Sequence, residues 1–185
     1  AAIALDPNSF EAQYFNARSC ITQGKLGESA RHFQRAAEIN PDDYQALLVL
    51  TGIHRSLGRE EEMKVVAREG VARAERELTL HPENPRPAYL GAVGLAALGE
   101  LDRAKEWAAR ALAIDPDDRL AKYNVACFYS LAGEFERAID LLVELLPGAT
   151  HETKRWVKHD SDLDPIRRHP RFPKVLELLE QERPP

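Results

Sequence analysis

The sequence has little of what marks a secreted, membrane-spanning or disulfide-bonded protein. Its 185 residues include only two cysteines, and no apolar run approaches the roughly 20 residues that span a bilayer. No basic segment followed by an apolar one opens the chain, as it would in a secretory leader. We expect Cys20 and Cys127 to be buried small residues rather than a disulfide pair. These absences predict a cytoplasmic protein that does not bind a membrane.

An excess of basic charge is also missing. Lysine and arginine number 25 against 30 aspartates and glutamates, so the formal net charge is −5. Proteins that bind nucleic acid usually carry a basic patch or stripe. The balance of charge therefore argues against a nucleic-acid partner.

Catalytic motifs are nearly absent. HETKRWVKH begins at His151 like a zinc-protease motif, but Arg155 stands where the second histidine is required. GKLGES, which begins at Gly24, lacks the spacing and the preceding strand of a phosphate-binding loop. No G-x-S-x-G nucleophile motif occurs. We expect no enzymatic activity and no cofactor.

Three aspartates at alternate positions, Asp160, Asp162 and Asp164, suggest a calcium loop. The glycine and the closing glutamate of such a loop are missing, and Arg167 supplies a nearby positive charge. We interpret the run as helix capping and surface ion pairing, with no bound metal. His54 falls at a packed position of its helix and is expected to be a core histidine.

Residues that end helices recur with one period. Residues 85–118 show the unit best, with a helix from about Pro87 to Leu98, a turn at Gly99 and a second helix that ends near Ile114. The turn glycines are Gly24, Gly58, Gly99 and Gly133, and the prolines that follow each second helix are Pro7, Pro41, Pro82 and Pro116. Both sets are separated by 34, 41 and 34 residues. A single helix pair cannot bury its apolar faces alone, so the repetition predicts a stack.

The residues within each unit resemble the tetratricopeptide repeat (TPR) family. The fourth unit has Val125, Ala126 and Tyr129 in its first helix, then Ala138 and Leu142 in its second, which match the family's alternation of small and large residues. The large aromatic that the family carries early in the first helix is absent from all four units. The resemblance implies an all-α fold, a right-handed TPR superhelix of antiparallel helix pairs with a C-terminal helical cap.

The period divides the chain into six segments. They are residues 1–7 as the end of a truncated preceding repeat, 8–41 as TPR 1, 42–82 as TPR 2 with an extended second helix, 83–116 as TPR 3, 117–148 as TPR 4, and 149–185 as the C-terminal helical cap. The first residues resemble the end of TPR 3, so we expect a fragment of a longer protein.

The 41-residue interval places seven additional residues in the second helix of TPR 2. Seven residues are close to two helical turns and rotate the apolar face by only about 20°. We therefore predict one long helix from about Glu60 to Leu80. Gly70 in its middle costs about 1 kcal/mol relative to alanine, which predicts a close contact or a bend there.

The last segment departs from the repeat. Trp156 precedes an acidic run from Asp160 to Arg167 and a Pro-Arg-Phe run that ends at Phe172. We expect a helix from about His151 to His159, a short helical turn, and a last helix from about Pro170 to Gln181. The segment resembles the ending of TPR arrays in bacterial multidomain proteins, which often follow a cyclase or kinase domain. Terminal units of a stack need a different outer face.

The candidate binding surface is the concave groove that first helices line in TPR proteins. One position per repeat holds Tyr14, Leu48, Tyr89 and Tyr123, again 34, 41 and 34 residues apart. Rigid aromatic rings with arginines suit peptide capture. The predicted peptide-binding residues are Tyr14, Arg18, Leu48, Arg55, Arg86, Tyr89, Tyr123 and Asn124. An alternative is that the tyrosines pack against the next repeat.

We therefore predict a non-catalytic protein–protein interaction scaffold that binds a peptide or partner segment in the groove. Two alternatives remain open. One is that the domain is a regulatory or tethering arm of a larger bacterial signalling enzyme. The other is that it is a self-association module that forms a homo-oligomer. The lysine and asparagines with which some TPR grooves clamp a C-terminal carboxylate are not matched here, because Tyr14, Arg18 and Val49 hold those places.

Overall fold

The computed structural model describes residues 8–181. Its elements are α2 (Phe10–Thr22), α3 (Leu26–Ile39), α4 (Gln45–Ser56), α5 (Glu60–Leu80), α6 (Arg86–Ala97), α7 (Leu101–Ile114), α8 (Arg119–Leu131), α9 (Phe135–Leu145), α10 (His151–His159), the 3₁₀ helix η1 (Ser161–Ile166) and α11 (Phe172–Glu180). No strand occurs between residues 8 and 181. The expected truncated repeat at residues 1–7 lies outside this range. No helix within it is both long and apolar enough to cross a membrane.

The pairs α2–α3, α4–α5, α6–α7 and α8–α9 each have one turn between their two helices, and each turn contains one of the periodic glycines. Gly24, Gly58, Gly99 and Gly133 have φ angles of 73°, 67°, 79° and 78°. A side chain would strain this left-handed conformation, which glycine adopts freely. The turn glycines are therefore equivalent bends, as their spacing predicts.

The starts of several helices are capped by serine or aspartate side chains, which favour this position. Ser9 Oγ accepts a hydrogen bond from the Ala12 amide at 3.2 Å, and Asp43 Oδ2 accepts one from Ala46 at 2.7 Å. Asp118 does the same for the first amides of α8. Each cap satisfies an amide that the helix itself leaves without a partner.

Small residues let the helices of a pair approach closely. A Cβ atom at Gly91 would lie 2.2 Å from Cζ3 of Trp107, so the indole of α7 occupies the space over this glycine. Ser29 is fully buried and donates to the Ala17 carbonyl oxygen at 2.8 Å, which joins α3 to α2. Both expected buried cysteines are buried and free.

The long helix α5 has the bounds expected from the seven-residue insertion. It contains 21 residues, whereas α3 and α7 contain 14 each. Gly70 lies where α5 crosses α4: a Cβ atom there would be 2.9 Å from Cγ and Cδ2 of Leu48 and 3.2 Å from Cβ of Leu47. This glycine marks a close contact.

The substitution Gly70→Ala should lower the free energy of unfolding by about 1 kcal/mol. Alanine gains about 1 kcal/mol in helix propensity, but overpacking against Leu48 costs about 1–3 kcal/mol. Gly27→Ala is the matched control, because its site in α3 has nothing within 4 Å, and it should stabilise by about 0.5 kcal/mol. Urea denaturation measures both. Equal stabilisation by the two variants would contradict the close packing at Gly70.

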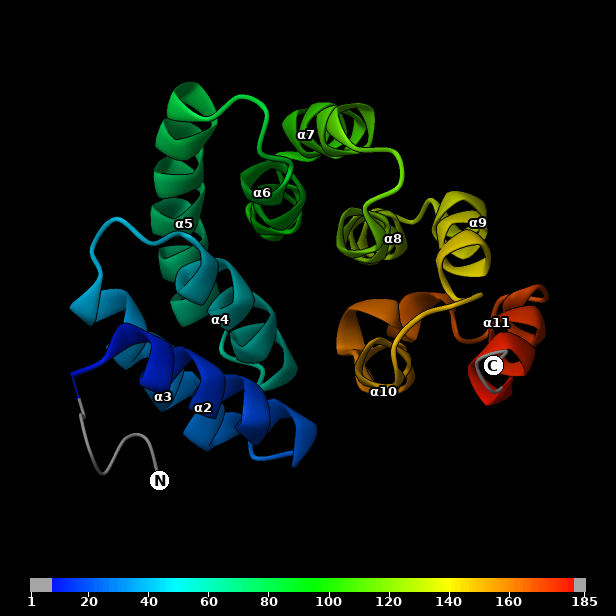
Figure 1. Cartoon of the computed structure of the whole chain (residues 1–185), viewed down its shortest axis with the longest axis horizontal. Helices are drawn as coiled ribbons and strands as arrows, with labels where there is room; N and C mark the ends of the chain where they lie inside the picture. The colour runs from blue at the N-terminus through cyan, green and yellow to red at the C-terminus, as the bar shows by residue number, and fades with distance from the viewer. Residues whose placement is uncertain (1–7, 182–185) are drawn as a thin grey trace.

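The helix pairs curve around a common centre. Figure 1 shows α4, α6 and α8 nearer to this centre than α5, α7 and α9. We call the surface formed by α2, α4, α6 and α8 the inner face. The C-terminal cap continues the curve, and α10 turns back towards the helices of the N-terminal half (Figure 1).

The buried apolar residues form two clusters. The N-terminal cluster includes Phe33 of α3 with Leu47 and Leu50 of α4. The larger one extends from α4 and α5 to α11 and includes Leu48 and Leu142. Helix α4 therefore contributes neighbouring leucines to both clusters and joins the two halves.

Candidate functional site

The structure places all eight predicted peptide-binding residues on the first helix of a pair, but their environments differ. Leu48, Tyr89 and Tyr123 are buried, Tyr14, Arg18, Arg55 and Asn124 are half-buried, and Arg86 is exposed. Leu48 packs against Gly70 of α5, and Asn124 Nδ2 donates to the Leu120 carbonyl oxygen of its own helix at 2.8 Å. The other six divide into a group covered by the C-terminal cap and a group that remains open.

Arg18 belongs to the covered group. Its guanidinium forms an ion pair with Glu152 of α10 at 2.8 Å and lies 4.7 Å from the ring centroid of Trp156. Arg155, one turn along α10, donates to the Thr22 carbonyl oxygen at the end of α2. The first helix of the described chain is therefore bonded directly to the C-terminal cap.

Arg55 is the second covered residue. Its Nη1 donates to Oδ1 of Asp162 in η1 at 2.6 Å, and the neighbouring Ser56 and Ser161 hydroxyls lie 2.6 Å apart. Asp162 is only 7% exposed. Burial raises the pKa of its carboxyl to about 6, with Asp160 acting in the same direction and Arg55 in the opposite one.

The expected surface ion pairing is wrong for Asp162. The cap folds onto the inner face, so this carboxylate is enclosed between η1 and α4 rather than exposed to solvent. The capping part of the interpretation is confirmed at Asp160, whose Oδ1 accepts from the Asp162 amide at 2.9 Å. Asp164 pairs with Arg167 at the surface as expected.

Tyr123 completes the covered group. Its hydroxyl donates to Asp160 Oδ2, and its ring lies 6.0 Å from that of Trp156. Only 5% of the residue is exposed, and burial raises the pKa of its hydroxyl well above the ordinary value. Tyr123 thus contacts the cap rather than the open inner face.

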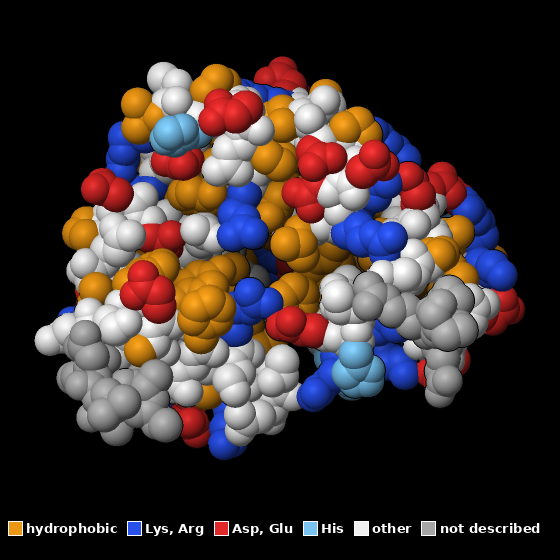
Figure 2. Space-filling model, in the orientation of Figure 1, with side chains coloured by type: hydrophobic (Ala, Val, Ile, Leu, Met, Phe, Trp, Pro, Cys, Tyr) orange, Lys and Arg blue, Asp and Glu red, His pale blue; other side chains and the backbone are white. Residues whose placement is uncertain are grey.

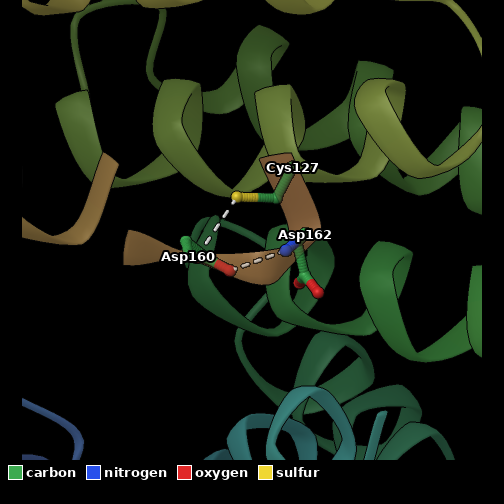
Figure 3. A group of neighbouring side chains, drawn as sticks. All are labelled: Cys127, Asp160 and Asp162. Atoms are coloured by element: carbon green, nitrogen blue, oxygen red, sulfur yellow. Dashed lines mark hydrogen bonds between the residues drawn. The ribbon is translucent and has the colours of Figure 1, made fainter. Parts of the chain in front are cut away.

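Cys127, Asp160 and Asp162 are close enough to suggest a metal site (Figure 3). Cys127 Sγ lies 3.7 Å from Asp160 Oδ2, the oxygen that also accepts the hydrogen bond from Tyr123. Burial raises the pKa of the thiol well above its ordinary value, which disfavours the thiolate that binds metals. Arg55 already neutralises Asp162. Each of these groups therefore already has a hydrogen-bond or ion-pair partner within the protein.

Tyr14, Arg86 and Tyr89 form the group without a hydrogen bond or ion pair to the cap in the described chain, and of these Arg86 is exposed, Tyr14 half-buried and Tyr89 buried. Arg86 Nε donates to the Tyr89 hydroxyl at 3.1 Å, and its Nη1 donates to Gln45 Oε1 at 2.9 Å. The Tyr14 ring packs edge-on against Phe33 at 5.3 Å. Burial raises the pKa of both tyrosine hydroxyls above the ordinary value.

Arg86 and Tyr89 line a pocket of about 670 Å³, which we call the mouth pocket. It lies where α4, α6 and α8 begin. Its other lining residues include Asp42, Asp43, Tyr44, Glu77, Asp115 and Asp118. Figure 2 shows a hollow near the middle of the visible face, with basic, acidic and apolar side chains around it.

Tyr44 and Glu77 were missed in the sequence analysis. Tyr44 follows Asp42 and the capping residue Asp43, and an aromatic residue in a polar turn was the available signal. Glu77 lies in the long α5, and only the packing of α5 against α6 brings it to the same pocket. His54, expected in the core, is buried as predicted.

Comparison with known proteins identifies the fold. No protein-family model matches the sequence, and no curated protein sequence matches it. The structure is similar to that of TTC0263, a thermophilic TPR protein of Thermus thermophilus, with a TM-score of 0.58 at 18% identity over 92% of this chain and 88% of that one. A putative kinesin light chain with nearly identical TPR-like repeats from Podosopora anserina gives a TM-score of 0.51 at 16% identity, with 94% of each chain covered.

The chain also aligns with a mutant of Thermobaculum terrenum O-GlcNAc transferase, at 20% identity and a TM-score of 0.49. That alignment covers 74% of this chain and only 25% of the transferase.

Stacked antiparallel helix pairs with an inner face define a helical-repeat protein. The chain has the all-α superhelical fold of tetratricopeptide repeat proteins.

Proposed function

We propose that the chain is a non-catalytic protein–protein interaction scaffold that binds an extended segment of a partner at the open part of its inner face. The observation that carries the proposal is the position of Arg86 and Tyr89 in the mouth pocket, next to the α4–α6 junction. Arg86 Nη2 makes no hydrogen bond within residues 8–181 and can donate to a peptide carbonyl oxygen. The Tyr89 hydroxyl accepts from Arg86 and retains its own proton for a second acceptor.

The proposed binding site lies towards one end of the inner face. Arg18, Arg55 and Tyr123 already contact the cap, so a partner that meets the folded chain reaches exposed Arg86 and half-buried Tyr14 first. Tyr89 is only 3% exposed and supports Arg86 through the hydrogen bond between them. Arginine and tyrosine are among the residue types that most often dominate binding energy at protein interfaces.

The substitution Arg86→Ala should weaken binding of peptides selected on a peptide array about tenfold, which corresponds to the loss of a strong interface contact. Tyr89→Phe should weaken the same peptides less, because it removes one hydroxyl and keeps the ring that packs in the core. Fluorescence anisotropy measures the affinities. Arg68→Ala is the matched control, because Arg68 is exposed on the outer helix α5. Equal effects of Arg86→Ala and Arg68→Ala would overturn the proposed site.

A further inference from the structure

The mouth pocket carries an excess of negative charge. Five carboxylates line it, from Asp42, Asp43, Glu77, Asp115 and Asp118, and Arg86 is its one cationic lining residue within the described chain. None of the five makes an ion pair with a residue between positions 8 and 181. Arg86 bonds to Gln45 and Tyr89 instead.

Part of this charge already has a structural use. Asp43 and Asp118 accept amide hydrogen bonds at the starts of α4 and α8, and Asp115 accepts one from Asp117. The partial positive charge of the helix N-termini offsets these carboxylates further. Asp42 and Glu77 differ, because their carboxylates make no hydrogen bond or ion pair within residues 8–181.

A second observation comes from Tyr44. The residue is only 5% exposed, yet its hydroxyl makes no hydrogen bond to the rest of the described chain. Tyr44 lines the mouth pocket together with Arg86, Glu77 and Asp43, and the charges of these three residues act on its hydroxyl. The Tyr44 oxygen is not one of the fully enclosed atoms without a partner among the described residues, which are His54 Nδ1 and Ser130 Oγ. It therefore remains accessible from the pocket as a donor and acceptor.

We propose that the mouth pocket binds the side chain of a lysine or arginine carried by the partner segment. This rests on the proposed function and names the chemistry of the partner. An ammonium or guanidinium group is a donor only, and the pocket offers it acceptors at Asp42, Glu77 and the Tyr44 oxygen. Tyr44 and Tyr89 also line the pocket, and aromatic rings attract cations. A volume of about 670 Å³ admits such a side chain.

Amide chemical shifts of the full chain, followed by two-dimensional NMR, test the proposal. The probe is Nα-acetyl-lysine methylamide at millimolar concentration, compared with its norleucine and glutamate analogues. Lysine should shift amides in residues 40–45, 84–89 and 115–118, and the two analogues should leave them unchanged. Raising the salt concentration should weaken the lysine effect, because the charges are partly exposed.

Three variants identify the groups involved. Asp42→Asn and Glu77→Gln should each raise the dissociation constant for the lysine probe by about threefold, as expected for a single partly exposed ion pair. Tyr44→Phe should raise it as well, without loss of folding by circular dichroism. Glu106→Gln, an exposed glutamate on the outer helix α7, is the matched control and should have no effect.

The proposal is overturned if norleucine shifts the same amides as lysine, or if Asp42→Asn and Glu77→Gln bind the probe as tightly as Glu106→Gln does. Failure of the proposal that the pocket binds a basic side chain can be distinguished from failure of the proposed function. Array peptides that lack basic residues but still depend on Arg86 would leave the scaffold in place and remove only the basic partner.

Discussion

Replacing Arg55 with alanine is expected to lower the free energy of unfolding by about 3 kcal/mol at pH 8, because it leaves the carboxylate of Asp162 buried without its partner. The two residues are 107 positions apart in the chain and join α4 to η1. Their side chains are 23% and 10% exposed, so solvent compensates little for the loss. Urea denaturation measures the difference from the unsubstituted chain.

The cost of Arg55→Ala should depend on pH. The folded-state pKa of Asp162, about 6, lies above its ordinary value of 3.8, so the folded state binds this proton more tightly than the unfolded state. The stability that this carboxyl contributes is fully present below about pH 4 and is lost as the pH rises through about 6. Removal of Arg55 matters most where the carboxyl is ionised. We therefore expect a smaller destabilisation at pH 4.5 than at pH 8.

A double variant supplies the control. Arg55→Ala combined with Asp162→Asn removes both charges and should be less destabilised at pH 8 than Arg55→Ala alone, since an amide is cheaper to bury than an unpaired carboxylate. If Arg55→Ala costs the same at both pH values and the double variant recovers nothing, the Arg55–Asp162 pair does not hold the cap as described.

The second large effect is expected for Phe33→Ala. It should lower the free energy of unfolding by about 3–5 kcal/mol, because it replaces a large side chain with a small one in a filled core. Phe33 is fully buried in the N-terminal cluster and packs against Tyr14. Because helical repeats contact mainly their neighbours, the loss should be local. Hydrogen exchange should speed up in α2, α3 and α4 and remain slow in α8 and α9.

Leu142→Ala is the matched substitution in the other cluster, where Leu142 is also fully buried. It should cost about 2–5 kcal/mol and increase exchange in α8 and α9 instead. If either variant accelerates exchange uniformly from α2 to α11, the two clusters unfold as one unit. That outcome would show that α4 and the polar contacts between cap and inner face couple the halves more strongly than expected.

Those contacts also bear on function. The cap is anchored to α8 and α9 by fully buried Val157, Leu163 and Ile166, whereas its links to α2 and α4 are polar. A partner that widens the inner face would break these polar contacts and leave the apolar anchor intact. The mouth pocket is open without any such change, which is why the proposed site is centred there.

Much of the fold followed from local signals in the sequence. Gly58 and Gly99 form turns with a positive φ, which only glycine adopts without strain, and their place in the repeat period distinguished them from glycines within helices. The insertion after Gly58 lengthened α5 to the expected Glu60–Leu80, because seven residues nearly preserve the helical face. The residues of the candidate site were harder to predict from the sequence. Period and residue type placed Tyr14, Tyr89 and Tyr123 on equivalent helices, but they carry no information on what covers each helix.

The sequence by itself determined the helix pairs, their boundaries and the order of their stacking, because turns, caps and apolar periodicity act over a few residues. Only the tertiary structure decided that Tyr123 lies beneath the cap, that Asp162 is buried against Arg55, and that Tyr44 meets Glu77 in one pocket. These relations join residues more than 30 positions apart. They depend on the curvature accumulated over the whole stack, which no single repeat encodes.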